Sequence, residues 1–316
     1  MLDADVTQLD FDIVCIDAGY IRPRLACSYL IAHQGRAAFI DCGTTHSVPH
    51  MTESLKNIGL STNDVEYIIP THVHLDHAGG AGSLMQTCSN ATLVAHPKGA
   101  RHLINPQRLV ESARSVYGEK KFDSLYGEIL PIEESRVFAA GDKSEISLNG
   151  RKLTIADTPG HARHHFCIYD EMSHGWFTGD TFGLSYPDII TDSGQYLMPT
   201  TTPTQFEPEA WQKSIDRLLE TDPKRMFLTH YGMIEGVEIY AEKLSRDLKA
   251  YCELALTVKD EENQVQALCN EITNFTINDL RQMGCMLAEP EIEKLLSMDI
   301  NLNAQGLEGW LKRLAT

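Results

Sequence analysis

Four side chains able to bind a metal ion lie within six consecutive residues of this chain. They are His72, His74, Asp76 and His77 in the stretch THVHLDHAGG, which follows an apolar run. Imidazole and carboxylate together form a ligand set typical of zinc, iron and manganese sites. Because only 13 of the 316 residues are histidine, chance rarely produces such a string. We therefore interpret it as a metal-binding motif and not as a run of solvated histidines.

Three further candidate ligands each end a short apolar run: His161 in DTPGHARHH, Asp180 in GWFTGD and His230 in RMFLTHYG. Such runs predict strands, and functional side chains gather in the loops at strand ends. His164 and His165 compete with His161, which we favour because it directly follows a Pro-Gly turn. For Asp180 the alternative is a carboxylate that caps a loop, and for His230 it is a structural histidine of the core.

The chain supplies strands and helices in alternation to position these residues. FDIVCIDAG, CSYLIAHQG and RAAFIDCG predict an antiparallel meander, and EYIIPTHVHLDH predicts a strand that ends in the histidine motif. VPHMTESLKNIGL predicts a helix, and so does EAWQKSIDRLLETD, whose apolar residues at 211, 215, 218 and 219 follow helical spacing. Sheets with intervening helices indicate a layered α/β architecture.

Composition and charge argue against several classes of protein. The net charge of −17, without a cluster of lysine and arginine, disfavours a nucleic-acid partner, because phosphate binding depends on such clusters. The start, MLDADVTQLDFDIVCIDAGY, resembles no signal peptide, and no apolar run is long enough to cross a membrane. We expect a cytoplasmic protein with no membrane partner. The eight cysteines form no C-x-x-C pair and predict reduced thiols, several of them in the core.

Two segments depart from the alternation of strands and helices. Residues 98–135, between two of the metal motifs, predict an amphipathic helical insertion that is either a lid over the site or a packing layer. The C-terminal region predicts acidic helices. We therefore divide the chain into a domain over residues 1–240, which contains the insertion, and a helical C-terminal extension over residues 241–316. Both helical segments are also candidate surfaces for a homodimer.

The order of the motifs resembles the metallo-β-lactamase-fold hydrolases over roughly residues 10–235, and THVHLDHAGG with TPGHA is especially similar to the glyoxalase II-like branch. The resemblance implies a four-layer αβ/βα sandwich with two metal ions between its sheets. It implies seven ligands: His72, His74 and His161 for one ion, Asp76, His77 and His230 for the other, and Asp180 as the bridge. Asp41 in FIDCGTT resembles a family aspartate that orients a ligand histidine, and the alternative is an ordinary turn aspartate.

The resemblance also implies a reaction. Two divalent ions, zinc first with iron or manganese as alternatives, would generate a bridging hydroxide that attacks a small ester, thioester or lactone. Among the ligands we assign catalytic roles to Asp76 and Asp180. The rival functions on the same fold are iron-dependent oxygen chemistry, of the persulfide dioxygenase or diiron oxidoreductase type, and a non-catalytic metabolite sensor.

The substrate is expected to be a small molecule, and the sequence names only weak candidates for its contacts. They are Tyr20, Arg22, Tyr117 and Tyr186, which lie in predicted loops or in the insertion. Ordinary surface or core roles are the alternative for all four. From residue 250 onward the chain contains eleven acidic and five basic residues. Glyoxalase II-like enzymes bind a glutathione thioester with a basic, aromatic C-terminal region, and the sequence departs from that pattern.

Overall fold

The structure is a computed structural model that describes residues 6–315, apart from the side chains of residues 116 and 117. Its contacts divide the chain into two compact units. Unit 1 comprises Met1–Asp157, His164–Gly179 and Lys224–Met233, and unit 2 comprises Thr158–Arg163, Asp180–Pro223 and Ile234–Thr316. The predicted boundary after residue 240 lies inside a helix that runs from Val237 to Thr257, and the two-domain division at that point stays a prediction.

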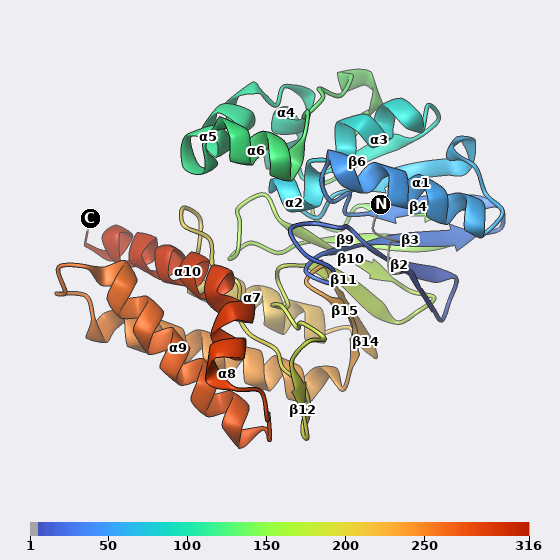
Figure 1. Ribbon diagram of the computed structural model, residues 1–316. Helices are drawn as coiled ribbons and strands as arrows, with labels where there is room; N and C mark the ends of the chain where they lie inside the picture. Colours follow the sequence, from blue (N-terminus) through green and yellow to red (C-terminus); the bar gives the residue numbers. More distant parts are fainter. Residues whose placement is uncertain (1–5, 316) are drawn as a thin grey trace. The chain divides into compact units, whose positions relative to one another are not determined.

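The first sheet has seven strands in sequence order (Figure 1). Its first four strands pair antiparallel, as the predicted meander requires, and the last three join in parallel. The strands are β1 (Val6–Leu9), β2 (Ile13–Asp17), β3 (Cys27–His33), β4 (Arg36–Ile40), β5 (Val65–Ile69), β6 (Thr92–Ala95) and β7 (Val137–Ala139). In the parallel part, β4 and β5 run side by side, so their carboxyl ends open onto the same edge.

The second sheet has six strands in the order β15-β14-β11-β10-β9-β8. Its central strands are apolar on both faces, which is the pattern of a sheet buried between layers. The strands are β8 (Glu145–Leu148), β9 (Arg151–Asp157), β10 (Phe166–Asp170), β11 (Gly175–Gly179), β14 (Arg225–Leu228) and β15 (Gly232–Glu235). Strands β11 and β14 pair in parallel, so the residues that follow Gly179 and Leu228 leave the sheet at the same end.

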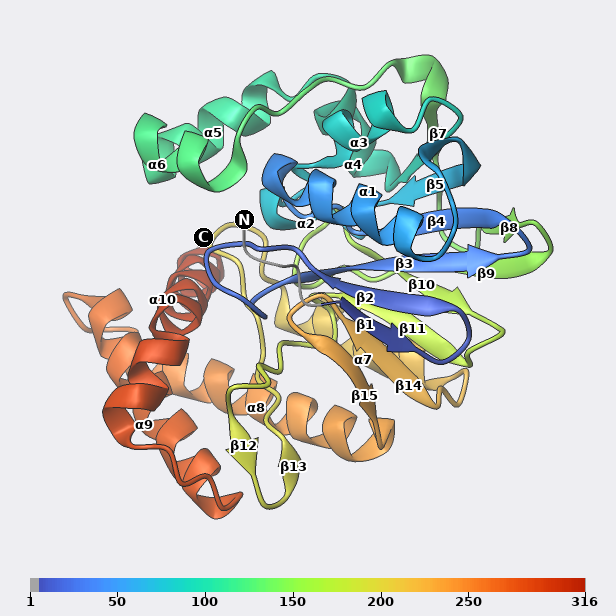
Figure 2. The ribbon, with the colours of Figure 1, turned by 45° about the vertical axis from the view of Figure 1, so that its right-hand side comes forward.

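Two apolar cores hold the layers of unit 1 together. Between the sheets, buried residues such as Tyr29, Phe177 and Phe227 interlock, and the rings of Phe177 and Phe227 stack with centroids 4.5 Å apart. On the outer face of the first sheet a second core includes Phe39 and Leu55. It lies beneath the helices α1 (Val48–Asn57), α2 (Leu75–Ala78), α3 (Ala81–Thr87) and α4 (Pro97–Ile104), which cover this face in Figure 2.

The predicted insertion forms three helices, α4, α5 (Gln107–Tyr117) and α6 (Glu119–Tyr126). Part of it is packed firmly, because Phe122 and Tyr126 of α6 and Ile132 beyond it are buried. Helix α5 is different: none of its described side chains is buried. Figures 1 and 2 show α5 and α6 extending beyond α4.

Unit 2 is mainly helical. Its helices are α7 (Pro208–Leu219), α8 (Val237–Thr257), α9 (Gln264–Gln282) and α10 (Glu289–Leu314), and a short hairpin pairs β12 (Ile190–Thr191) with β13 (Gly194–Gln195). Helices α8 and α9 share a largely buried ion cluster, in which Lys243 contacts Asp247 and Asp279 at 2.5 Å each. This ion cluster joins two helices of the extension through charge as well as through apolar contact.

Two sequence-based expectations meet the structure directly. Every cysteine is a free thiol, and six of the eight are buried, as the apolar context of several of them predicts. Within the described part of the chain, no helix combines the length and the apolar character that crossing a membrane requires.

The buried pair Arg151–Asp170 offers a test of the second sheet. Both side chains are fully buried, and the guanidinium donates to both carboxylate oxygens and to the carbonyl of Phe11. We expect Asp170→Asn to lower the free energy of unfolding by about 3 kcal/mol or more, because it leaves a buried guanidinium without its counter-charge. Urea unfolding measures this. Glu53→Gln, which removes an exposed pair with Lys56, serves as the control and should change stability by less than about 1 kcal/mol. Equal unfolding midpoints for the two variants would contradict a stabilising role of the buried Arg151–Asp170 pair.

Candidate metal centre

The histidine motif lies where β5 ends and the short helix α2 begins. Residues 71–73 bend away from the strand, and α2 then carries Asp76 and His77. After α2 the backbone passes so close to Cys42 that only glycine fits at position 80. A Cβ at this position would lie 2.5 Å from the carbonyl oxygen of Cys42. The candidate ligands of the histidine motif therefore lie on a turn between β5 of the first sheet and α2.

Asp41 is the centre of a buried hydrogen-bond network in unit 1. Its carboxylate accepts from the backbone N–H of Thr71 at 2.7 Å, from the hydroxyl of Thr229 at 2.6 Å, and pairs with His77 Nδ1 at 2.8 Å. Asp41 itself has a φ of 53°, a left-handed conformation that aspartate tolerates better than most residues. The network joins the ends of β4, β5 and β14, so Asp41 orients His77 and is more than a turn aspartate.

Cys42, the neighbour of Asp41, does not compete for a metal ion. Burial and then the negative charge of Asp41 raise the pKa of the Cys42 thiol. A thiol binds metal as the thiolate, which this environment disfavours.

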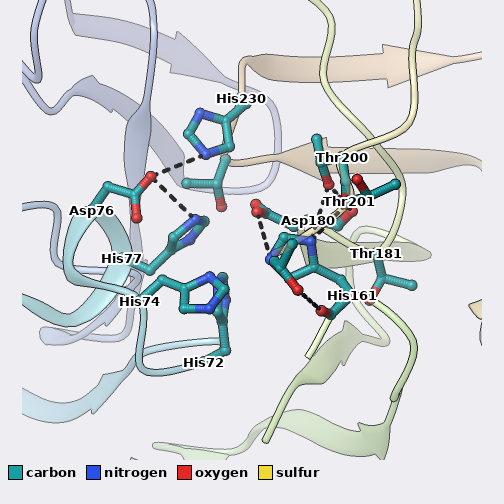
Figure 3. A network of polar contacts seen from close by, with 12 residues as sticks. His72, His74, Asp76, His77, His161, Asp180, Thr181, Thr200, Thr201 and His230 are labelled. Atoms are coloured by element: carbon teal, nitrogen blue, oxygen red, sulfur yellow. Dashed lines mark hydrogen bonds and ion pairs between the residues drawn. The ribbon is translucent and has the colours of Figure 1, made fainter. Parts of the chain in front are cut away.

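Asp76, His77 and His230 form a compact group within unit 1, shown in Figure 3. His77 Nδ1 pairs with Asp41, and His230 Nδ1 donates to the carbonyl of Leu25 at 2.8 Å. These bonds turn each Nε2 toward Asp76 Oδ2, at 3.9 Å from His77 and 3.6 Å from His230. Two atoms bound to one ion at about 2.0–2.2 Å lie at most about 4.4 Å apart, so Asp76 is close enough to share a divalent ion with either histidine.

His72 and His74 bring two ring nitrogens together in the same loop. His72 Nε2 and His74 Nδ1 lie 2.8 Å apart, and the hydroxyl of Thr71 lies 3.1 Å from His72 Nδ1. His165 packs its ring on that of His72, with centroids 4.9 Å apart. His164 lies further from His72, with centroids 6.2 Å apart. In unit 1 both are therefore packing partners of His72, while His96 caps α4 and pairs with Asp157.

His161 and Asp180 lie together in unit 2. His161 Nδ1 donates to the carbonyl of Thr200 at 2.8 Å, which turns Nε2 toward Asp180 Oδ2 at 3.1 Å (Figure 3). Gly160 supplies the turn before His161: its φ is 135°, and a Cβ there would lie 2.3 Å from Trp211. Both side chains are buried, and neither His161 nor Asp180 has the exposed position of a loop cap.

Helix α10 holds the loop that orients His161. The side chain of Asn303 accepts from the N–H of Thr201 at 2.6 Å and donates to the carbonyl of Pro199 at 3.0 Å. The Thr201 hydroxyl donates to the Asn303 carbonyl at 2.9 Å. Gly306 allows this approach, because a Cβ there would lie 2.2 Å from the Thr201 hydroxyl. The C-terminal extension thus supports a candidate metal ligand.

The weak substrate candidates have structural partners of their own. Tyr20 is buried, stacks on Tyr126 and shares a 2.9 Å hydrogen bond with its hydroxyl. Tyr186 is buried and donates to Asp299 at 3.0 Å. Arg22 donates to the carbonyl of Pro23, and the side chain of Tyr117 lies outside the described part of the chain. A role for these four in substrate binding stays a prediction.

Sequence reasoning missed the residues that orient the ligands. Thr71 and Thr229 each stand directly before a ligand histidine, in PTHVH and LTHYG, and this repeated Thr-His pair is a signal that could have found them. The carbonyls of Leu25 and Thr200 carry no such signal, because any residue provides a carbonyl. Asn303 lies in a helix that shows only helical spacing in the sequence.

Asn303 provides a test of the support from α10. We expect Asn303→Ala to weaken metal retention by about tenfold, because orienting partners of metal ligands contribute about 10–100-fold to affinity. Competition with a chromogenic chelator measures the loss. Asn301→Ala, at an exposed position on the same helix, is the matched control and should bind metal as the original chain does. Unchanged retention in Asn303→Ala would show that the loop holds His161 without α10.

The chain resembles proteins of known sequence and structure along most of its length. Residues 21–230 match the family model of the metallo-beta-lactamase superfamily. The metallo-beta-lactamase fold-containing protein ST1585 of Sulfurisphaera tokodaii is 26% identical over 225 residues, which cover 69% of this chain and 78% of that protein. The solved structure of ST1585 from Sulfolobus tokodaii superposes with a TM-score of 0.66 at 24% identity, covering 93% of this chain and 97% of the other.

A shorter similarity concerns the acyl-coenzyme A thioesterase MBLAC2 of Gallus gallus, 28% identical over 117 residues. It covers 35% of this chain and 40% of that protein. Other relatives are named probable metallo-hydrolases, which supports a hydrolase at the level of the family.

These matches confirm the predicted αβ/βα sandwich with its helical insertion and C-terminal extension. The narrower glyoxalase II-like assignment stays a prediction. The family match covers the histidine motif, His161, Asp180 and His230. On that basis, the chain belongs to the metallo-β-lactamase superfamily.

Proposed function

We propose that this chain is a dinuclear metal-dependent hydrolase of a small ester, thioester or lactone. The observation that carries the proposal is the group Asp76, His77 and His230, whose ligand atoms lie within 4.8 Å of one another. Asp41 and the carbonyl of Leu25 each bind the Nδ1 of one imidazole, the arrangement in which metal-binding histidines are usually held.

The proposed ligand sets follow the family positions. His72, His74 and His161 would hold one ion, Asp76, His77 and His230 would hold the other, and Asp180 would serve both. Divalent ions held there, zinc first and iron or manganese as alternatives, would supply a Lewis acid for a carbonyl oxygen and a water of lowered pKa. With Asp180 contributing to both, each ion would have four protein ligands, so a reacting water would need an additional, fifth coordination position.

The residues of the chain prepare this chemistry by fixing positions and tautomers. Asp41 keeps the proton of His77 on Nδ1, and the carbonyls of Leu25 and Thr200 do the same for His230 and His161. Each Nε2 then presents a lone pair without rearrangement. Such preorganisation removes the cost of ordering the ligands when the ions bind.

The substrate class rests on the carbonyl chemistry of the proposed centre. The similarity to a protein named as an acyl-coenzyme A thioesterase supports including thioesters. The acidic C-terminal extension departs from a glutathione-binding region, which favours thioesters other than that of glutathione.

A substitution of Asp41 tests whether the orientation of His77 contributes to metal binding, because Asp41 is not itself a proposed ligand. We expect Asp41→Asn to lower metal affinity by about 10–100-fold, because the amide cannot accept simultaneously from Thr71, Thr229 and His77 as the carboxylate does. Metal content after dialysis measures the effect, and circular dichroism checks that the fold persists. Asp157→Asn, which affects the pair with His96, is the control outside the proposed ligand set. Full metal content in Asp41→Asn would show that Asp41 is structural.

Elemental analysis tests the proposal as a whole. We expect close to two equivalents of metal per chain, lowered to one or fewer in His74→Ala and Asp180→Ala, with hydrolysis of ester, thioester and lactone substrates reduced by at least 10³-fold. Each variant should still unfold cooperatively. One iron per chain with no second ion after reconstitution would contradict the dinuclear hydrolase and favour oxygen chemistry or a sensor. Full hydrolytic activity in either variant would contradict the ligand assignment.

A further inference from the structure

Two adjoining cavities lie on the insertion, within unit 1. One of about 610 Å³ is lined by Pro106, Val110, Ile129 and Pro131 and by the charged Arg114 and Glu119; because its exposed lining is mainly apolar, we call it the apolar cavity. The other, of about 430 Å³, is lined by Arg101, His102 and Arg108, and we call it the basic cavity. Asn105, Gln107 and Glu111 line both, so the two cavities are neighbours.

The apolar cavity explains why α5 has no buried described side chain. A helix with an apolar side normally buries it against another element, whereas Val110 of α5 faces a cavity. The volume lies within the range of about 300–1,000 Å³ typical of sites for small molecules. The apolar lining therefore favours a ligand with a hydrocarbon portion.

The basic cavity carries a local charge opposite to that of the whole chain. Arg101 and Arg108 contribute two guanidinium groups against one carboxylate, that of Glu111, which accepts a hydrogen bond from Gln107 at 2.9 Å. Burial, followed by the charges of Arg101 and Arg108, lowers the pKa of His102. Both guanidinium charges therefore act on the same space, although the chain carries a net charge of −17. A guanidinium pair is suited to phosphate or carboxylate oxygens.

We propose that these cavities together form a binding site for an anionic single-chain amphiphile. The hydrocarbon chain occupies the apolar cavity, and the phosphate or carboxylate head lies between Arg101 and Arg108. The three shared lining residues place the two cavities side by side, so one ligand can span them. This site is separate from the proposed metal centre, and its occupancy does not depend on hydrolysis.

The position of α4 gives the site a physical link to the histidine motif. Gly99, at the start of α4, packs against Val73, which stands between His72 and His74: a Cβ on Gly99 would lie 2.8 Å from the Val73 side chain. Arg101 follows two residues later, about 3 Å further along the helix axis. A ligand bound at Arg101 therefore lies on the element that packs against the metal-binding loop.

The test is a calorimetric titration of the protein with dodecyl phosphate below its critical micelle concentration, which measures the binding affinity. We expect it to bind at least tenfold more tightly than inorganic phosphate or dodecanol, because only the amphiphile fills both cavities. The double variant Arg101→Gln/Arg108→Gln should lose at least tenfold in affinity for dodecyl phosphate and little for dodecanol. Val110→Gln should also weaken the amphiphile, whereas Arg36→Gln, which changes an exposed arginine paired with Glu66, should leave binding unchanged. Dodecanoate in place of dodecyl phosphate distinguishes a carboxylate ligand from a phosphate ligand.

Several results would overturn the proposal. Equal affinity of the original chain and the double variant would show that the arginines do not hold the head group. Loss of amphiphile binding after chelation would place the ligand at the metal ions instead. Binding to vesicles of anionic phospholipid without binding of the monomeric amphiphile would indicate a membrane surface. Because every arm measures binding, these results stay distinct from failure of the hydrolase proposal, which elemental analysis and turnover decide.

Discussion

The hydrogen bonds of the buried Asp41 carboxylate fix the position of the histidine motif in unit 1. The carboxylate ties together three strand ends, from β4, β5 and β14, that are distant in sequence, and it does so through Thr71, Thr229 and His77. A buried carboxylate is stable only when donors surround it, so these contacts both satisfy the charge and fix the ligand loop. Asp41 therefore links the two sheets. A shift of one sheet against the other would break a hydrogen bond to its carboxylate.

Much of this arrangement was predictable from the residues. Strand alternation gave the antiparallel meander, and the apolar spacing at residues 211, 215 and 218 gave α7, because local periodicity determines which side chains are buried. The candidate metal-binding histidines could be singled out because their chemistry is rare and their spacing is short, and the structure brings them together in groups that could hold a metal ion. The supporting contacts were not: a carbonyl at Leu25 or Thr200 has no signature in sequence, and the partner of Thr201 lies about a hundred residues further along the chain, in α10.

The insertion combines two kinds of element. Helix α6 is fixed by Phe122 and by the Tyr20–Tyr126 contact, whereas α5 stands over a cavity and buries none of its described side chains. The firmly packed portion resembles a structural layer, and α5 resembles the wall of a binding site. The packing-layer alternative fits α6, and a lid over the metal site stays a prediction.

The dependence of His161 on Asn303 also bears on the order in which the protein matures during synthesis. His161 precedes its support by more than a hundred residues, and the loop of Pro199 and Thr201 obtains its partner only when α10 has been made. Unit 1 contains Asp41, Asp76, His77 and His230, all of which leave the ribosome earlier. Because domains tend to fold as their residues emerge, we expect a nascent chain to form the Asp76 group before the loop that orients His161 gains its support from α10.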